Sequence, residues 1–404
     1  MPDANTPLPD WLAWLETLSP TEIDLGLERV QIVLERLDIE RPKHVLLIGG
    51  TNGKGSSVAM AEALLLDAGY RTGAYTSPHI ERYNERVRVA GVEVSDKDIT
   101  DALFAVEAVR DDLPLTYFEF GTLAAFVVFA THGVDAWILE VGLGGRLDAT
   151  NVVDPDASLI TNVSLDHCEW LGDDVETIAV EKAGIMRAGK PVIFADKTVP
   201  ATIRSQAAKI GASLILPEIP ADLPTPGLIG AFQRRNAAGV LALLEAAGLA
   251  DAVESARVAR VLPKVTLAGR SQRLMIEGTQ WLLDVAHNAA AAAVLAETLA
   301  ADRRQTTAII GVLDDKDLDG ILWPLAALVS RWVAVEAESP RAISAAELSR
   351  RIANGCDKAC LTAESMPQAI EYARRVPAEN DRILVTGSFF TVGPALRQIK
   401  EFSS

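Results

Sequence analysis

The sequence is poor in cysteine and in positive charge. Only three cysteines occur in 404 residues, Cys168, Cys356 and Cys360, and this odd, sparse set argues against a disulfide framework. Cys356 and Cys360 are four positions apart, but no second pair completes a metal site, so we expect incidental thiols. Lysine and arginine number 38 against 55 acidic residues, for a net charge of −17. This balance argues against nucleic-acid and membrane-surface partners, because both require clustered positive charge.

Long apolar runs are also missing. No stretch approaches the length of apolar sequence that a membrane-spanning helix needs. The opening segment MPDANTPLPDWLAWLETL has neither the basic region nor the apolar core of a signal peptide. We therefore expect a cytoplasmic protein. Apolar residues make up 49% and charged residues 23% of the chain, which indicates a globular protein, and its length favours two domains.

The most informative stretch is HVLLIGGTNGKGSS, from His44 to Ser57. A short apolar run of strand type is followed by glycines around Lys54 and then by apolar residues at helical spacing. A glycine loop between a strand and a helix directs backbone N–H groups and the positive end of the helix at one point, which suits nucleotide phosphates. The loop departs from the common GxxxxGK[ST] pattern, because Gly55 follows Lys54 and the hydroxyl is deferred to Ser56. We interpret it as a phosphate-binding loop; the alternative is a plain glycine turn.

Alternating helix and strand segments surround this loop and predict a doubly wound parallel sheet. Beyond a linker at Pro263–Gly269, the stretch RLMIEGTQWLLDV predicts two strands joined by a turn near Gly278, and further alternation predicts a second, smaller domain. We therefore predict an α/β protein with a P-loop domain over residues 1–268, built on a doubly wound, mainly parallel sheet, and a Rossmann-like α/β domain over residues 269–404. The helices expected in the first domain include Leu15–Ile39, Ile99–Val109 and Val175–Met186, and its strands include Arg71–Tyr75, Ala136–Val141, Ala157–Val163 and Pro191–Ala195.

Polar residues stand at several predicted strand ends. Glu140 ends a buried strand before a glycine run, where a carboxylate could ligate Mg2+ near bound phosphates; the alternative is a carboxylate satisfied by backbone groups. His167, beside Asp166, is expected at the end of the next strand, where a ligand contact and a structural role are equally open. Ser77 follows the strand Arg71–Tyr75 and, taken alone, is a turn residue.

Two further groups have a default structural interpretation. Lys182 lies inside a predicted helix, and its local pattern favours a solvated surface lysine. Asp284, His287 and Asn288 fall at a strand-to-helix junction, where an exposed histidine and an N-capping aspartate are expected.

Taken together, these stretches resemble the bifunctional dihydrofolate synthase/folylpolyglutamate synthase family of the Mur ligase superfamily. The deferred serine of the glycine loop is normal in this family. The resemblance extends in the family's order from near residue 44 to near residue 394. The matching stretches are GTNGKGSS, TSPHIERYNERVRV, LTYFEFGTLAAF, LEVGLGGRLDATNVVD, SLDHCEWLG, EKAGIMRAG, AGRSQ, DVAHN, GVLDDKD and VTGSFFTVG.

The resemblance implies roles for individual residues. Lys54, Lys182 and His287 would act in catalysis, with Lys182 as a carbamylated lysine. The other implied roles concern metal, pterin and nucleotide. Ser77, Glu140 and His167 would ligate Mg2+; Thr116, Phe118, Asp148 and Ala149 would bind the pterin; and ATP would contact Gly50, Thr51, Asn52, Gly53, Lys54, Gly55, Ser56, Gln233, Asn236, Arg270, Asp284 and His287. Phe118 is available to stack on the pterin and Asp148 to bond its edge. Ala289 replaces a proline that often follows DVAHN.

The activity implied is an ATP-dependent amide ligation. L-glutamate would be added to dihydropteroate, forming dihydrofolate, and to the polyglutamate chains of reduced folates, through an acyl phosphate and with release of ADP and phosphate. Mg2+ and a monovalent cation such as K+ would assist a monomer that acts on small molecules. The alternatives are a folylpolyglutamate synthase alone, a P-loop nucleotide-dependent switch, and a Mur enzyme acting on a UDP-linked substrate, although TYFEFG favours folate.

Overall fold

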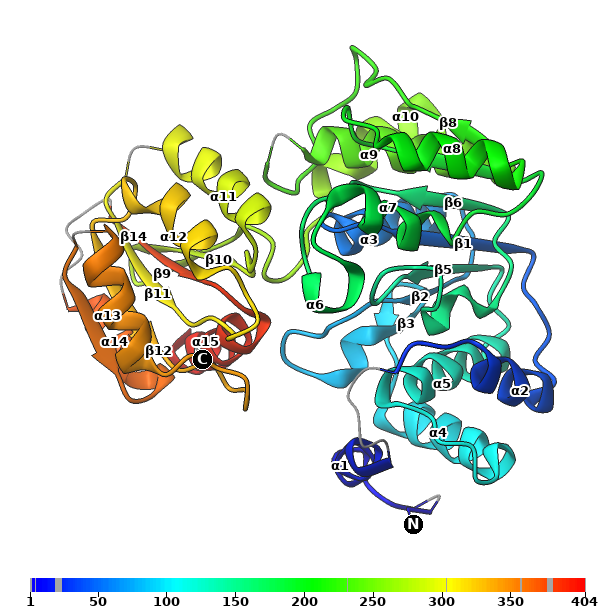
Figure 1. The fold of residues 1–404 in the computed structure, drawn as a ribbon, viewed down its shortest axis with the longest axis horizontal. Helices are drawn as coiled ribbons and strands as arrows, with labels where there is room; N and C mark the ends of the chain where they lie inside the picture. Colours follow the sequence, from blue (N-terminus) through cyan, green and yellow to red (C-terminus); the bar gives the residue numbers. More distant parts are fainter. Residues whose placement is uncertain are drawn as a thin grey trace. The chain divides into compact units, whose positions relative to one another are not determined.

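The computed structural model divides into two compact units (Figure 1). It describes residues 2–3, 5–18, 24–230, 232–302, 304–356, 358–375 and 381–403. The first unit comprises Met1–Thr225 and Arg234–Val265, and the second comprises Pro226–Gln233 and Thr266–Ser404.

The first unit is built on an eight-stranded sheet in the order β4-β3-β2-β5-β1-β6-β7-β8. From β2 to β8 every neighbouring pair is parallel, whereas β3 and β4 form an antiparallel extension at the β2 edge. The sheet is therefore mainly parallel, as predicted, and the short extension is what the sequence pattern missed. The strands are β1 His44–Gly49, β2 Thr72–Tyr75, β3 Val87–Val89, β4 Val92–Glu93, β5 Ala136–Glu140, β6 Ala157–Ile160, β7 Pro191–Phe194 and β8 Ser213–Ile215.

Helices pack against this sheet and bury its central strands, and α4 and α5 lie side by side (Figure 1). Helix α5 is apolar on nearly every face because it is enclosed by other elements, and its Phe126 stacks on Trp137 of β5 with ring centroids 4.8 Å apart. The helices are α1 Leu8–Leu18, α2 Glu28–Leu37, α3 Lys54–Asp67, α4 Asp96–Arg110, α5 Tyr117–Thr131, α6 Cys168–Leu171, α7 Val175–Ala183, α8 Ala201–Ile210, α9 Gln233–Ala246 and α10 Ser255–Val261.

The second unit is a six-stranded sheet in the order β13-β12-β11-β14-β10-β9. Strands β9 and β10 are antiparallel and joined at Gly278, which confirms the predicted hairpin, and the remaining pairs are parallel. Its strands are β9 Gln272–Ile276, β10 Thr279–Asp284, β11 Thr306–Ile310, β12 Arg331–Val335, β13 Cys360–Ala363 and β14 Arg382–Thr386, and its helices are α11 Ala289–Ala301, α12 Leu318–Ala326, α13 Ala345–Cys356, α14 Met366–Arg374 and α15 Phe389–Ser403.

Several predicted elements have other bounds in the structure; the helix expected over Val175–Met186, for example, ends at Ala183. The helix expected over Leu15–Ile39 is the end of α1 followed by α2, and residues 19–23 of that stretch lie outside the described residues. The strand expected over Ala157–Val163 ends at Ile160, because the next residues hydrogen-bond to the glycine loop: the Thr161 hydroxyl donates to the Asn52 carbonyl at 2.7 Å.

The three cysteines are free thiols, as the spacing predicted. Within the described ranges, no helix combines the length and apolar character needed to cross a membrane.

Candidate active site

The glycine loop lies between β1 and α3 and approaches neighbouring side chains too closely for any other residue type. Gly50 has φ +138°, and a Cβ there would stand 1.8 Å from Oγ1 of Thr161. Gly53 has φ +89°, and a Cβ there would stand 2.7 Å from Nδ2 of Asn236. Both positions therefore require glycine for backbone conformation and for space. The second contact also places Asn236, on α9, directly beside the loop.

Lys54 folds back over this loop from the first position of α3. Its ammonium donates to the carbonyls of Gly50 at 3.0 Å and Thr51 at 3.2 Å. The side-chain oxygen of Asn162 accepts from the backbone N–H groups of Thr51 and Asn52 at 3.2 and 2.9 Å. Asn162 was not predicted, because its sequence neighbourhood does not distinguish it from an ordinary turn residue. The pairing of β1 with β6 is what brings it to the glycine loop.

The helix that follows the loop begins with buried small residues. Ser56, which bears the deferred hydroxyl, is buried in the first turn of α3, and the Ser57 hydroxyl donates to the Gly53 carbonyl at 2.9 Å. Lys54, Gly55 and Ser56 therefore occupy the N-terminal turn of a helix, whose positive end favours an anion.

Glu140 and Ser77 meet at the ends of neighbouring strands. The register of β1 and β5 sets Glu140 opposite Ile48, immediately before the glycine loop. Glu140 is buried, and its Oε2 accepts from the Ser77 backbone N–H at 3.3 Å. The parallel order of β2, β5 and β1 therefore brings together two of the three predicted metal ligands beside the phosphate-binding loop.

His167 occupies a different position from the one predicted. It lies seven residues beyond the end of β6, as the N-cap residue of α6, in a left-handed conformation with φ 49°. Its backbone N–H donates to Oδ1 of Asp166 at 2.9 Å. The expected strand-end position was wrong because the chain leaves β6 early to contact the glycine loop.

The side chains next to the glycine loop suit a metal ion that is bound together with a nucleotide. Within the part of the chain that the structure describes, no group of three or more His, Cys, Asp and Glu side chains could hold a metal ion by itself. Mg2+ is commonly held by one or two carboxylates together with substrate phosphates and water. The buried carboxylate of Glu140 next to the loop fits that arrangement.

The basic residues after β2 are engaged within the protein. Arg88 pairs with Glu62 of α3 at 2.8 Å, and Arg82 pairs with Asp96 at 3.2 Å. Arg86 donates from Nε to Nδ1 of His79 at 2.9 Å. Burial and the Arg86 guanidinium lower the pKa of His79 to about 4, so that imidazole is neutral.

The predicted pterin residues lie at two adjoining segments. A Cβ added to Gly142 would stand 2.6 Å from the Phe118 ring and 3.0 Å from Oδ2 of Asp148, so these two side chains approach the same point. Thr116 is the N-cap of α5 and exchanges hydrogen bonds with Glu119. Ala149 is buried at the start of the 3-10 helix Ala149–Val152.

Asp148 is a buried carboxylate that organises its own loop. It accepts from Leu143 N–H at 2.8 Å and from the N–H and hydroxyl of Thr150 at 3.0 and 2.6 Å. Burial raises the pKa of Asp148, and these hydrogen bonds oppose that effect.

Lys182 is buried, with 3% of its surface exposed, so the interpretation of its local pattern as a surface lysine was wrong. It shares one face of α7 with Ile178, which is also buried, and this face packs inward. Burial, together with the nearby Lys54 ammonium, lowers the pKa of Lys182 to about 7, against the opposing effect of Asp166 and Asp148.

In the second unit, the end of β10 holds Asp284 and His287. Oδ2 of Asp284 accepts from the N–H and hydroxyl of Ser271 at 2.7 and 2.9 Å, and Oδ1 accepts from the Ala286 N–H at 2.9 Å. Desolvation raises the pKa of Asp284, while the Arg270 guanidinium and these hydrogen bonds act against it. His287 is half-buried, with Nδ1 2.9 Å from the Val285 carbonyl oxygen.

Helix α11 is capped by Asn288, whose side-chain oxygen accepts from the Ala291 N–H at 2.9 Å. The expected aspartate cap was therefore wrong, because Asp284 is occupied by Ser271 and Ala286. The helix begins at Ala289.

An aromatic ring supports the predicted nucleotide residues of this unit. The guanidinium of Arg270 lies 4.9 Å from the centre of the Phe389 ring, and the His287 ring lies 6.0 Å from it. Phe389 begins α15. Sequence reasoning did not single out Phe389 or Ser271. The place of Phe389 depends on the pairing of β14 with β10, and that of Ser271 on the pairing of β9 with β10.

The two units match two families of known domains. Residues 48–218 match the Mur ligase middle domain, and residues 269–389 match the Mur ligase, glutamate ligase domain. The chain is 39% identical to dihydrofolate synthase/folylpolyglutamate synthase of Escherichia coli K12, over 98% of this chain and 97% of that protein. It is 33% identical to the protein of the same name from Mycobacterium tuberculosis, over 93% and 90%.

Solved structures show the same likeness. The E. coli FolC structure in complex with DHPP and ADP matches with a TM-score of 0.93 at 38% identity, over 100% of both chains. The bifunctional folylpolyglutamate synthase/dihydrofolate synthase with Mn, AMPPNP and L-glutamate bound matches with a TM-score of 0.91 at 38% identity, over 99% of both chains. The α/β fold, the glycine loop and the full-length identity agree, and the chain belongs to the dihydrofolate synthase/folylpolyglutamate synthase family of Mur ligases.

Proposed function

We propose that this protein is an ADP-forming ligase that adds L-glutamate to dihydropteroate, forming dihydrofolate, and to the polyglutamate chains of reduced folates. The observation that carries the proposal is the grouping of Lys54, Glu140 and the buried Lys182 around the glycine loop of the first unit. Relatives named dihydrofolate synthase/folylpolyglutamate synthase match almost the whole chain, which supports the choice of substrates.

The reaction needs no covalent bond to the protein. A carboxylate oxygen of the pterin or folate attacks the γ-phosphorus of ATP, the bond to the β,γ-bridging oxygen breaks, and ADP leaves. The amino group of L-glutamate then attacks the acyl phosphate, inorganic phosphate leaves, and the amine gives up a proton. Because the charge is spread over phosphate oxygens, catalysis is mostly positioning and electrostatic stabilisation.

Each part of the nucleotide has a proposed partner. The loop from Gly50 to Ser56 contacts the phosphates in this proposal, and Lys54 exchanges its present carbonyl partners for phosphate oxygens. Gln233, Asn236, Arg270, Asp284 and His287 complete the ATP contacts in this proposal. Residues 1–268 then form the ATP-binding domain, and residues 269–404 form the ligase domain.

For the metal, we propose Mg2+ held by Ser77, Glu140 and His167, with a monovalent cation such as K+ as a second ion. A divalent ion would neutralise charge on the phosphates during transfer. The relatives crystallised with Mn support a divalent metal in this family. The contact between the Ser77 backbone N–H and the Glu140 carboxylate supports this proposal, because it holds the two residues side by side.

Lys182 has the properties that carbamylation requires. Addition of CO2 needs the neutral amine, which forms the N–C bond and releases one proton. A pKa of about 7 makes this form abundant at neutral pH, because burial penalises the ammonium. The product is an anion, which suits a site beside the Lys54 ammonium, and we propose that it orients the metal-bound groups.

For the pterin, we propose that Phe118 stacks on the ring system and that Asp148 accepts hydrogen bonds from its edge. Both side chains reach the vicinity of Gly142, where a Cβ would obstruct them. Thr116 and Ala149 would line the same site. The protein would act as a monomer in the cytoplasm on these small molecules.

The test is to incubate the protein with ATP, Mg2+, L-glutamate and dihydropteroate and to measure dihydrofolate and ADP. Formation of AMP would refute the acyl-phosphate route. A nucleotide-dependent switch would release ADP without glutamate, whereas the ligase requires it. Activity on reduced folates but not on dihydropteroate would favour a folylpolyglutamate synthase alone.

A further inference from the structure

The loop of residues 142–154, which carries Asp148, lies directly against the end of α7. The backbone N–H of Arg146 donates to the Glu181 carbonyl at 2.8 Å, and the Arg146 guanidinium pairs with the Glu181 carboxylate at 2.9 Å. This loop therefore contacts the residue that immediately precedes Lys182.

The two segments touch backbone to backbone. A Cβ on Gly145 would stand 2.8 Å from the Glu181 carbonyl oxygen and 3.3 Å from Cα of Lys182. A Cβ on Gly184 would stand 2.3 Å from Cβ of Arg146. With no side chain to act as a spacer on either side, a shift of one segment must move the other.

Asn151 bonds both segments with one side chain. It is buried, and its Nδ2 donates to the carbonyl of Arg146 at 3.0 Å and to the carbonyl of Gly184 at 3.1 Å. Its backbone N–H donates to the Asp148 carbonyl at 2.9 Å. The amide is thus linked to the loop that bears Asp148 and to the turn two residues beyond Lys182.

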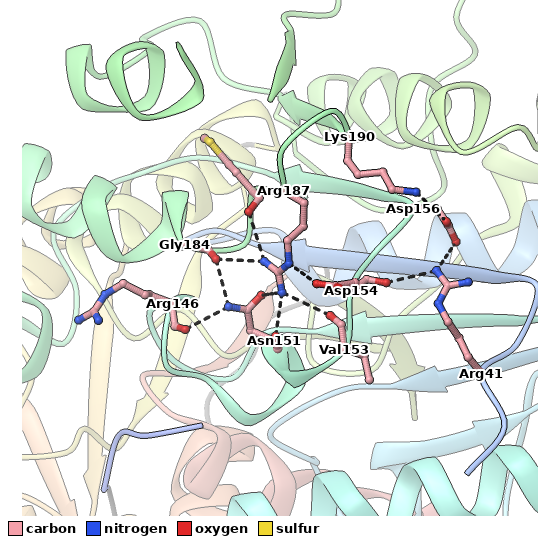
Figure 2. Close-up of polar contacts among 10 residues, drawn as sticks. Arg41, Arg146, Asn151, Val153, Asp154, Asp156, Gly184, Arg187 and Lys190 are labelled. Atoms are coloured by element: carbon pink, nitrogen blue, oxygen red, sulfur yellow. Dashed lines mark hydrogen bonds and ion pairs between the residues drawn. The ribbon is translucent and has the colours of Figure 1, made fainter. Parts of the chain in front are cut away.

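Arg187 completes the connection from the α7 side (Figure 2). It donates from one terminal nitrogen to the backbone and side-chain oxygens of Asn151 at 2.9 and 3.0 Å. Its other terminal nitrogen donates to the carbonyls of Gly184 and Met186, both at 3.3 Å, and Nε donates to Asp154. Only a planar guanidinium supplies donors in all these directions, so lysine cannot reproduce the set.

We infer that Asn151 and Arg187 are positioning residues that fix the distance between Lys182 and the pterin-binding loop. The inference rests on the proposed function, because it assigns Lys182 to the reacting centre and Asp148 to the pterin. Because the Asn151–Arg187 pair bonds residues 146–154 to residues 184–186, its loss should impair pterin binding and turnover. ATP binding at the phosphate-binding loop should be affected less.

The test compares Arg187→Lys with Lys190→Gln. Lys190 belongs to the same polar cluster (Figure 2), but it is 47% exposed and its ammonium pairs at 3.4 Å with Asp156, beyond the loop. For Arg187→Lys we expect kcat/KM for dihydropteroate to fall about 10- to 100-fold, because small misplacements of reacting groups are costly. KM for ATP should stay near the wild-type value in both variants.

A second measurement separates positioning from general destabilisation. Hydrogen exchange should quicken together in residues 142–154 and 181–186 of Arg187→Lys and of Asn151→Ser, and should stay unchanged in Lys190→Gln. An equal loss of kcat/KM in Arg187→Lys and Lys190→Gln would overturn this inference but not the proposed function. The same holds for proportional changes in the KM values for ATP and dihydropteroate in Arg187→Lys. A wild-type protein that forms no dihydrofolate would overturn the proposed function and this inference with it.

Discussion

At the scale of single residues, Lys54 has the clearest electrostatic role. Its ammonium is held over the glycine loop by two carbonyls, next to the phosphate site proposed above. We expect Lys54→Ala to reduce ligase turnover by about 100- to 1000-fold, the cost typical of losing one group that stabilises transition-state charge.

Lys43→Ala is the matched control for this substitution. Lys43 directly precedes β1, is 78% exposed and pairs with Asp135 at 3.6 Å. Its removal should leave ADP release, followed with a coupled assay, unchanged. A Lys54→Ala enzyme with normal turnover would exclude this site.

Lys182 gives a prediction about stability and pH. Its pKa is about 7 in the folded protein and 10.5 for an ordinary lysine. Between these values the unfolded chain binds the extra proton, so the free energy of unfolding of wild type should rise with pH across this window. Below about pH 7 Lys182 is protonated in both the folded and the unfolded protein, and the cost of burying the ammonium is fully present.

Lys182→Met removes that cost and keeps the apolar stem. We expect the variant to be more stable than wild type near pH 6, to lose this advantage as the pH approaches about 10, and to have no ligase activity. Denaturant unfolding in buffers depleted of CO2 measures the difference. A variant that is less stable than wild type at the acidic end would contradict the assigned pKa.

At the scale of elements, a buried ion pair ties α3 to the segment after β2. Arg88 on β3 pairs with Glu62 on α3, with side chains 15% and 8% exposed. Arg88 also donates to the Thr76 hydroxyl at 3.3 Å, next to Ser77. The pair therefore connects the phosphate-binding helix to the loop that presents a predicted metal ligand.

Arg88→Met would leave the Glu62 carboxylate buried without its cation. We expect this variant to lose about 3–5 kcal/mol of unfolding free energy, whereas the double variant Glu62→Leu/Arg88→Met should lose much less. Thermal and denaturant unfolding provide the values. Arg82→Met serves as the control, since Arg82 is 64% exposed and its loss should cost under about 1 kcal/mol. A single variant as stable as the double one would show that the pair is not coupled.

The β5–β1–β6 order is the element-scale reason why the site forms. It sets Glu140 beside the end of β1 on one side and Thr161 and Asn162 beside it on the other. Ligand sites in parallel sheets gather at these carboxyl ends because loops from neighbouring strands converge there.

At the scale of the whole molecule, metal dependence should follow nucleotide binding. No group of three or more His, Cys, Asp and Glu side chains among the described residues could hold an ion unaided. We therefore expect EDTA to abolish ligase activity and to leave the unfolding midpoint of the nucleotide-free protein unchanged. Calorimetry with and without EDTA checks this, and a large fall in the midpoint would reveal a structural metal instead.

The net charge of −17 affects how the whole molecule can bind anionic ligands. ATP and polyglutamate are anions, and a protein with this balance must concentrate cations at the point of binding. In the proposed site Lys54 supplies such a cation at a helix N-terminus, while Arg82, Arg86 and Arg88 are already engaged by Asp96, His79 and Glu62. The basic residues near the site thus serve mainly to build the loop after β2.

Features that depend on neighbouring residues could be predicted from the sequence alone. The glycine loop follows from the order of an apolar strand, glycines with Lys54 and a helix, and the parallel sheet follows from the alternation of elements. The β9–β10 hairpin likewise follows from two apolar runs around Gly278. These patterns are local, so periodicity and backbone preference are enough to predict them.

The burial of individual side chains and the contacts between distant segments depend instead on how the elements pack. Lys182 belongs to a helix whose sequence favours a surface position, and it becomes buried with a lowered pKa because the loop that holds Gly145 covers the end of α7. His167 leaves the strand end because residues after β6 bond to the glycine loop. Burial and such contacts arise between residues far apart in the chain, so no local pattern could specify them.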